Sequence, residues 1–210
     1  MSTLHIVEHP LIKHKVSMLR NSQTGFKEFR EVVEEIATLL CYEATRDLEL
    51  SKRTIPTPNG EFEVDMLDDD VNFGIVPVLR AGIGMVNGMH TLLPTAKVGH
   101  IGLYRDPDTL EPTEYYCKLP VDCENRKVFL IDPMLATGGT AVMSIDALKK
   151  RGVKDIKFLC LISCPEGVKR LQEVHPDVEI YTASHDSHLN EHGYIIPGLG
   201  DAGDRLFGTK

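Results

Sequence analysis

The chain has 210 residues, of which 42% are hydrophobic and 26% are charged, and its formal net charge is −8. This length fits one large domain, or one domain with a small attached lobe, and a chain of this size needs no disulfides to hold its core. The acidic balance and the lack of any Lys/Arg block argue against a nucleic-acid polymer as a partner. A small anionic ligand stays open, because a few arginines and backbone N–H groups are enough to bind one.

The cysteines give no sign of a disulfide framework or a zinc ribbon, because there are 5 of them and no two are spaced C-x-x-C. Thiols of this kind are typical of a reducing cytosol. The first ten residues include His and Glu and no long apolar run, so we expect neither a signal peptide nor a transmembrane span. The sequence therefore predicts a cytoplasmic protein that does not bind membranes.

Apolar residues recur at spacings of three and four over residues 26–48, which predicts an amphipathic helix. Residues 53–60 contain two prolines and an Asn-Gly pair, so we expect a turn-rich connection there. Short apolar runs then alternate with helical patterns. The predicted strands are 73–79, 98–103, 128–131, 156–162 and 178–181, and the predicted helices lie near 85–92, 140–151 and 167–174. This alternation favours an α/β fold with a mostly parallel sheet flanked by helices.

Two segments break the alternation. Residues 104–120 have little apolar periodicity and predict an extended arm or hairpin, whereas residues 188–210 contain five glycines and one proline. The glycines give the second segment more backbone freedom than a packed helix or strand needs. Ligands of open α/β folds bind beyond the carboxyl ends of the strands, and both segments could cover that edge. We therefore expect one domain over residues 1–210, with its core at about 70–182.

The most informative segment joins the strand 128–131 to a helix that starts near Thr140. It reads Asp132, Pro133, Met134, Leu135, Ala136, Thr137, Gly138, Gly139, Thr140. Its two glycines let successive backbone N–H groups converge on an anion, and the helix N-terminus adds positive potential. The threonine hydroxyls can donate to phosphate oxygens. The loop contains no lysine, so it is not the phosphate loop of ATPases. Its Asp132 carboxylate suits the hydroxyls of a ribose, although it could equally close an Asx turn.

A second glycine cluster follows the strand 73–79. Residues 82–88 approach the dinucleotide fingerprint G-x-G-x-x-G, but the third glycine comes one place late and no acidic residue marks the next strand end. These departures argue against a nicotinamide site. Arg80 precedes the turn and Arg105 opens the arm, and both could bind a pyrophosphate. Each alone could also be a surface ion pair.

Three histidines near the C-terminus form the pattern H-x-x-H-x-x-x-H, at His185, His188 and His192. This spacing could hold zinc. The segment is polar and has no clear helical pattern, so histidines of a surface loop are the simpler interpretation.

These segments together resemble the type I phosphoribosyltransferases and, in closer detail, the uracil phosphoribosyltransferase family. The loop 132–140 is similar to the phosphoribosyl diphosphate motif of that fold. The resemblance covers nearly the whole chain, through EHPL, YEAT, VLRAG, DPMLATGG and NEHGYIIPGLGDAGD at residues 8–11, 42–45, 78–82, 132–139 and 190–204. The last segment discriminates best, because it matches the base-binding hood of this family. We use the word hood for residues 188–210.

The resemblance implies a pyrimidine salvage reaction, in which ribose-5-phosphate moves from phosphoribosyl diphosphate to uracil to give UMP and diphosphate. It implies that Arg80 and Arg105 contact the diphosphate and act in catalysis. The loop 132–140 would hold the 5′-phosphate through its threonines and glycines, and the ribose hydroxyls through Asp132.

In the hood, the resemblance implies that backbone groups near Ile195, Gly200 and Ala202 hydrogen-bond uracil. Asp201 would lie between the base and the donor and would take part in catalysis. Many type I enzymes start the loop with two acids, but here Pro133 follows Asp132, as in the uracil enzymes. Mg²⁺ would therefore reach the protein mainly through the diphosphate and water, without direct protein ligands.

Two rivals remain beside this interpretation. A purine salvage enzyme could share the fold, and the hood is the feature that separates it from a uracil enzyme. A regulator that keeps the fold and binds RNA should display a basic face, which a net charge of −8 disfavours.

The resemblance also implies a homodimer or higher homo-oligomer, with GTP as an activator, although no separate guanine-nucleotide motif is readable.

Overall fold

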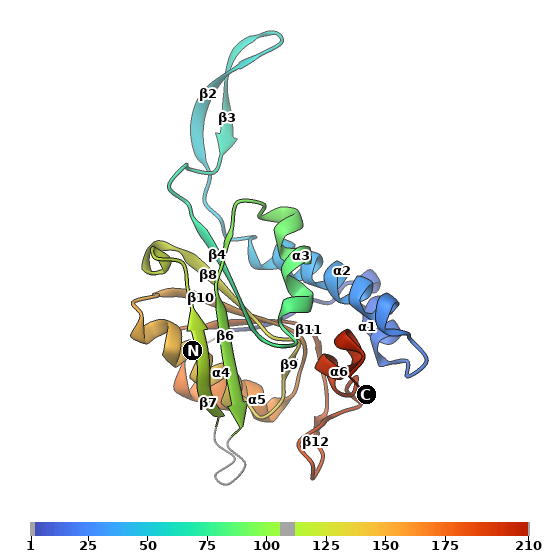
Figure 1. Ribbon diagram of the computed structural model, residues 1–210. Helices are drawn as coiled ribbons and strands as arrows, with labels where there is room; N and C mark the ends of the chain where they lie inside the picture. Colours follow the sequence, from blue (N-terminus) through green and yellow to red (C-terminus); the bar gives the residue numbers. More distant parts are fainter. Residues whose placement is uncertain (1–2, 106–111, 210) are drawn as a thin grey trace.

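Strands that are buried along almost their whole length form the centre of the molecule. The computed structural model describes residues 3–209 except 106–111, and the side chains of Arg105 and Pro112 lie outside this description as well. Its main sheet runs in the order β1-β11-β10-β8-β4-β6-β7, with β5 beside β4 and β9 beside β10 (Figure 1). The bounds are β1 Leu4–Ile6, β4 Phe73–Leu79, β5 Lys97–Val98, β6 His100–Arg105, β7 Pro112–Lys118, β8 Lys127–Ile131, β9 Met134–Leu135, β10 Asp155–Ser163 and β11 Glu179–His185.

The sheet is parallel except where β6 pairs with β7. Two hydrophobic clusters cover its faces, and alternate residues of one strand belong to different clusters. Phe129 and Ile131 pack with the helices α1 Pro10–Arg20, α2 Phe26–Ala44 and α3 Ile83–Leu92. Val128 and Leu130 pack with α4 Gly139–Lys150 and α5 Pro165–Val174. This burial on both faces explains why the central strands read as continuous apolar runs.

The predicted α/β fold with a mostly parallel sheet is confirmed. The strand 73–79 has its predicted bounds, and the other predicted strands and helices are present with ends shifted by a few residues. The helix predicted over 26–48 ends at Ala44, and the strand predicted over 98–103 is divided between β5 and β6. Of the predicted arm, the described residues form parts of the antiparallel β6–β7 pair.

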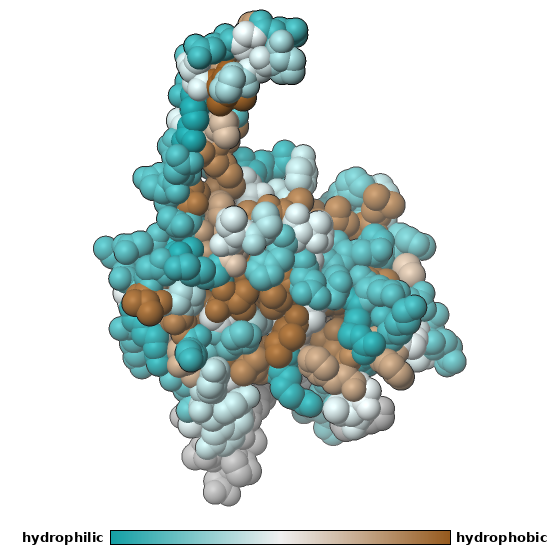
Figure 2. Space-filling view, turned by 45° about the horizontal axis from the view of Figure 1, so that its top comes forward, coloured by the Kyte–Doolittle hydropathy of each residue, from teal (hydrophilic) through white to brown (hydrophobic). Residues whose placement is uncertain are grey.

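The turn-rich connection predicted over residues 53–60 is much shorter in the structure. Only Pro58 and Asn59 form the turn, and the flanking residues form an antiparallel hairpin of β2 Ser51–Thr57 and β3 Gly60–Met66. This hairpin projects from the body, with hydrophobic side chains exposed among hydrophilic ones (Figures 1 and 2). Neither of its faces is buried, yet polar and apolar residues alternate strictly over residues 61–66, next to the Asn-Gly pair, which is a pattern typical of a hairpin strand.

The hood is more regular than its glycine content predicts. It contains the short antiparallel strands β12 His188–Leu189 and β13 Ile195–Ile196, and it ends in the helix α6 Ala202–Phe207. Leu206 anchors α6 in the core, because its side chain is fully buried. Within the described ranges, no helix is long and apolar enough to cross a membrane.

Candidate active site

The carboxyl ends of the central strands meet at one edge of the sheet. Pro77 on β4 and Leu159 on β10 both lie beside Ile131, the last residue of β8. The turn after β4 packs closely against this edge, since a Cβ atom on Gly82 would come within 2.6 Å of the Ile131 carbonyl oxygen. Only glycine permits such an approach. The turn that carries Arg80 therefore adjoins the loop that begins at Asp132.

The loop after β8 ends at an uncapped helix terminus. Gly138 has φ +78° at the N-cap of α4, and as a glycine it has no side chain with which to cap this end. A Cβ atom on Gly138 would also lie 2.9 Å from the Gly167 carbonyl oxygen, so glycine is needed for both conformation and space. The first N–H groups of a helix have no intrahelical partner and carry positive potential. This end of α4 can therefore bind an anion.

Carbonyl oxygens of the loop accept hydrogen bonds from β10 and from the residue that follows it. The Pro133 oxygen accepts hydrogen bonds from the N–H groups of Leu161 and Ile162 at 3.0 and 3.1 Å. The Ala136 oxygen accepts from the Cys164 Sγ–H at 3.2 Å. These bonds engage carbonyl oxygens that would otherwise repel an anion, and they fix the loop to β10.

A cavity of about 210 Å³ opens in front of this loop. Its lining residues all belong to the predicted loop and the start of α4: Asp132, Met134, Leu135, Ala136, Thr137, Gly138, Thr140 and Ala141. The predicted residues Pro133 and Gly139 are buried and do not line it. We refer to this space as the loop cavity.

Asp132 has an unusual electrostatic environment. Burial raises the pKa of its carboxyl group to about 7, and a backbone N–H group opposes this shift only weakly. That group belongs to Met134 and lies 3.5 Å from Oδ1, at the long limit for a hydrogen bond. The Asx turn that the sequence left open is thus poorly formed. A carboxylate in this position gains from a bound donor of hydrogen bonds, such as a ribose diol.

The hood forms a second cavity of about 210 Å³ next to the first. The predicted base-binding residues Ile195, Gly200, Asp201 and Ala202 all line it, and Met134 and Ala136 line both cavities. We call the second space the hood cavity. Its lining also includes Ala81, Gly193, Tyr194 and Gly203, which sequence reasoning did not single out although they lie in or beside the segments that carry the resemblance.

Two of the predicted catalytic residues lie near α6. The Asp201 side chain caps this helix, since Oδ1 accepts the Asp204 N–H at 2.9 Å. Arg80 is exposed, and its guanidinium carbon lies 5.8 Å from the centroid of the Phe207 ring. The third predicted residue, Arg105, ends β6, and its side chain falls outside the described part of the chain.

The histidine pattern does not form a metal site in the described structure. His185 Nδ1 lies 2.9 Å from Ser163 Oγ, and His192 lies 3.6 Å from Glu191. Across the described residues, no group of three or more His, Cys, Asp or Glu side chains is placed to hold a metal ion. Of the three, only His192 lies in a loop, because His185 ends β11 and His188 begins β12.

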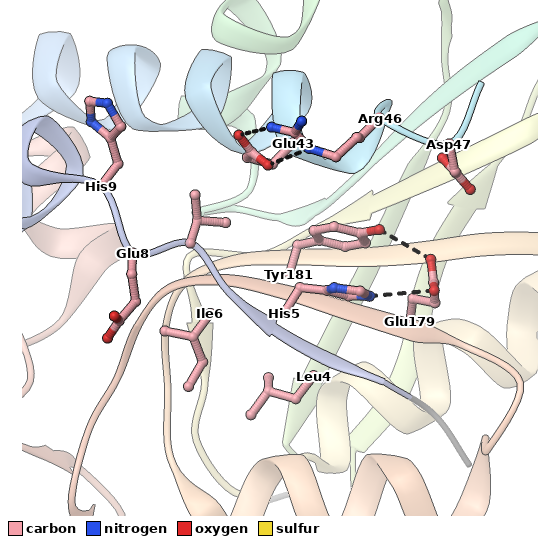
Figure 3. Close-up of a pocket in the computed structure, with 11 residues that line it drawn as sticks. Leu4, His5, Ile6, Glu8, His9, Glu43, Arg46, Asp47, Glu179 and Tyr181 are labelled. Atoms are coloured by element: carbon pink, nitrogen blue, oxygen red, sulfur yellow. Dashed lines mark hydrogen bonds and ion pairs between the residues drawn. The ribbon is translucent and has the colours of Figure 1, made fainter. Parts of the chain in front are cut away.

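A larger cavity, of about 600 Å³, lies along the edge strand β1 rather than at the carboxyl ends of the central strands. There the His5 ring stacks on Tyr181 with 4.3 Å between centroids, and Glu179 contacts both side chains (Figure 3). Arg46 is paired with Glu43. Neither the phosphate-loop residues nor the hood reach this cavity, so its size alone does not make it the active site.

Comparison with known proteins finds relatives over the whole length of the chain. The family model for uracil phosphoribosyltransferase matches residues 6–209. A protein of Agathobacter rectalis named uracil phosphoribosyltransferase is 61% identical over 210 residues, which is 100% of both chains. A solved structure of a protein from Aquifex aeolicus has a TM-score of 0.92 at 38% identity and covers 99% of each chain. Adenine phosphoribosyltransferase from Trypanosoma brucei shares the fold, with a TM-score of 0.58 at 13% identity over 85% of this chain and 81% of that one.

The raised pKa of Asp132 predicts a pH-dependent loss of stability. An ordinary aspartate titrates near 4, and the folded value is about 7. Folding therefore disfavours the ionised form, and stability falls as the pH rises from about 4 to about 7. We expect Asp132→Asn to raise the free energy of unfolding at pH 8 by about 2–4 kcal/mol, with no gain below pH 4.

Urea unfolding of the substrate-free protein at several pH values measures this difference. The exposed Asp70→Asn substitution is the control and should change the free energy of unfolding by less than about 0.5 kcal/mol at every pH. An Asp132→Asn variant no more stable than the unsubstituted protein at pH 8 would contradict the account of this carboxyl group.

Proposed function

The chain belongs to the uracil phosphoribosyltransferase family, and we propose how its residues carry out the reaction of that family. It transfers ribose-5-phosphate from phosphoribosyl diphosphate to uracil and gives UMP and diphosphate. We propose that uracil occupies the hood cavity and the 5′-phosphate occupies the loop cavity. The observation that carries this assignment is that Met134 and Ala136 line both spaces, so one ligand can span them.

In this proposal the residues of the loop cavity bind the donor. The N–H groups at the start of α4 and the hydroxyls of Thr137 and Thr140 donate to the 5′-phosphate. Asp132 accepts from the ribose hydroxyls. Because the loop is fixed to β10 from behind, the anomeric carbon is held at one distance from the base. Near-contact of about 3–3.5 Å between the reacting atoms supplies much of the acceleration.

The chemical step exchanges one bond at the anomeric carbon for another. The bond to the diphosphate oxygen breaks, positive charge develops on the sugar, and N1 of uracil forms the new bond while its proton passes to solvent. Arg80 and Arg105 stabilise the charge that grows on the departing diphosphate. Asp201 polarises the base through the carboxylate oxygen that does not cap α6. The exposed position of Arg80 beside Phe207 supports its role, because the guanidinium lies next to the hood.

Specificity for the base belongs to the hood. Backbone groups near Ile195, Gly200 and Ala202 offer a fixed pattern of donors and acceptors, which suits the two carbonyls of uracil better than the amine of cytosine. A site that leaves polar groups unpaired rejects the wrong ligand strongly.

Mg²⁺ is part of the same proposal, as the ion that accompanies the diphosphate. In the described structure Asp132 is the carboxylate of the loop cavity, and no cluster of metal ligands surrounds it. A single carboxylate fits an ion whose other ligands are oxygens of the donor and water molecules, rather than an ion enclosed by protein ligands. The ion would supply additional positive charge to the leaving group.

We also propose that the protein forms a homodimer or a higher homo-oligomer. An isolated two-stranded hairpin is marginally stable in water, yet β2–β3 projects alone with Phe62 53% exposed and Met66 38% exposed. A second copy packed against the hairpin would bury these side chains.

Activation by GTP, a cytoplasmic location and the lack of nucleic-acid or membrane partners stay predictions, as does the division of the single domain into core, arm and hood.

Replacing Arg80 tests the assignment of the diphosphate site. We expect Arg80→Ala to lower kcat with uracil by about 10²–10³-fold while the fold persists, because the exposed side chain stabilises charge that develops during the reaction. Diphosphate release under saturating substrates measures the effect, and circular dichroism checks the fold. Lys150→Ala removes an exposed cation at the other end of α4 and should keep normal turnover. Turnover of Arg80→Ala equal to that of the unsubstituted protein would exclude this role.

Replacing Phe62 tests the oligomer. Sedimentation equilibrium at micromolar concentration should give a multiple of the single-chain mass for the unsubstituted protein. We expect Phe62→Glu to shift the population toward single chains, because a charge would be buried in the contact. Glu63→Ala, the next residue on β3, should leave the mass unchanged. A single-chain mass for the unsubstituted protein would refute the proposal.

A further inference from the structure

A buried ion pair lies behind the hood and outside both cavities. Arg20, the last residue of α1, donates from its two terminal nitrogens to the two oxygens of Asp186, each at 2.6 Å. The Asp186 side chain is 2% exposed and that of Arg20 is 24% exposed. Ser184 adds hydrogen bonds to both partners. Such a two-pronged, charged contact is both strong and specific in direction.

This pair engages both backbone polar groups of Gly198. Asp186 Oδ2 accepts the Gly198 N–H at 2.9 Å, and Arg20 donates to the Gly198 carbonyl oxygen at 2.8 Å. Gly198 has φ +62°, and a Cβ atom there would lie 2.1 Å from the Ile195 carbonyl oxygen. The backbone therefore turns sharply at this point, between Ile195 and Gly200. Both of those residues line the hood cavity.

The next carbonyl along the chain is also held from outside the cavity. The Leu199 oxygen accepts from Arg205 at 2.8 Å, and the same guanidinium bonds the Asn21 oxygen at 2.7 Å. Consecutive peptide groups before Gly200 are thus tied to the end of α1. Neither Arg20 nor Asp186 lines the hood cavity. Any effect of the pair on the base must therefore pass through the backbone of Gly198.

We propose that Arg20 and Asp186 are positioning residues for base recognition, which fix the peptide groups from Gly198 to Gly200 so that the hood backbone meets the edge of uracil. This inference rests on the proposed binding of uracil in the hood cavity. Buried ion pairs are a poor source of net stability, but in some proteins they fix one conformation among several. Burial acts to raise the pKa of Asp186, and hydrogen bonds from Arg20, Ser184 and Gly198 outweigh it, so the net shift of the pKa is downward.

A positioning role differs from a purely structural one in its kinetic signature. If the pair only supported the fold, its loss would weaken the binding of both substrates or lower the amount of active protein. If it sets the shape of the hood, its loss raises the KM for uracil and leaves the KM for phosphoribosyl diphosphate unchanged, because the loop cavity is fixed separately to β10.

The experiment compares three variants with the unsubstituted protein. Asp186→Asn keeps the size of the side chain and loses its charge. Arg20→Lys keeps the charge but lacks the fork that reaches Asp186, Ser184 and Gly198 together. Arg20→Ala leaves a space that a guanidinium ion can fill. Lys127→Met is the control, because it removes one partner of the Lys127–Asp155 pair at the opposite end of β8.

We expect Asp186→Asn and Arg20→Lys to raise the KM for uracil by about tenfold or more, with the KM for the donor within about twofold, since small displacements of a binding group are costly. Millimolar guanidinium should lower the uracil KM of Arg20→Ala and should not change that of Lys127→Met. Uracil KM values within about twofold of the unsubstituted protein in folded Asp186→Asn would overturn the inference, as would equal rises in both KM values. A failure of the unsubstituted protein to use uracil would instead refute the proposed function.

Discussion

The backbone N–H groups at the start of α4 are the feature on which the site depends. A helix leaves these groups without internal partners, and a side chain commonly satisfies one of them. Here Gly138 occupies the N-cap with a positive φ, and a glycine has no side chain with which to cap the helix. The positive end of α4 is therefore left for a ligand. The close contacts at Gly82 and Gly138 then bring the turn after β4 and the helix α5 against the same loop.

The two cavities are held in place by different parts of the fold. The loop cavity is built on the ends of buried strands, and its carbonyl groups are bonded to β10. The hood cavity is built on a C-terminal segment whose conformation is held by charged side chains, one from α1 and one from the hood itself. Arg20 and Arg205 supply much of this support, through carbonyl groups of the hood. Different physical interactions thus fix the phosphate and the base.

The sequence predicted the parts of the fold that are buried on both sides. β4, β8 and β10 were recognisable because their apolar runs are continuous, and Gly138 was recognisable from its place between a strand and a helix. The helix α1 was missed, although Ile12, Val16 and Leu19 recur at helical spacing and are all buried. The hairpin was missed although residues 61–66 alternate between polar and apolar after an Asn-Gly pair, because the two prolines before that pair indicated a longer turn.

The finer features of the site depend on contacts between distant residues. Arg20 and Asp186 are 166 positions apart, and no local pattern links them. The high pKa of Asp132 comes from burial, which the sequence does not show. The capping bond from Asp201 to the Asp204 N–H was readable in principle, because an aspartate before a helix is a common N-cap. It was obscured by the glycines on either side of Asp201.

The most direct test of the account is the choice of base. The purified protein would be incubated with Mg²⁺, phosphoribosyl diphosphate and either uracil, cytosine, hypoxanthine or adenine, and diphosphate release would be followed. The account predicts release with uracil and, for each other base, a rate at least about 10²-fold lower, because the hood would leave polar groups unpaired. Comparable release with a purine or with cytosine would contradict the role assigned to the hood. Release with none of the four bases would contradict the assignment of both cavities.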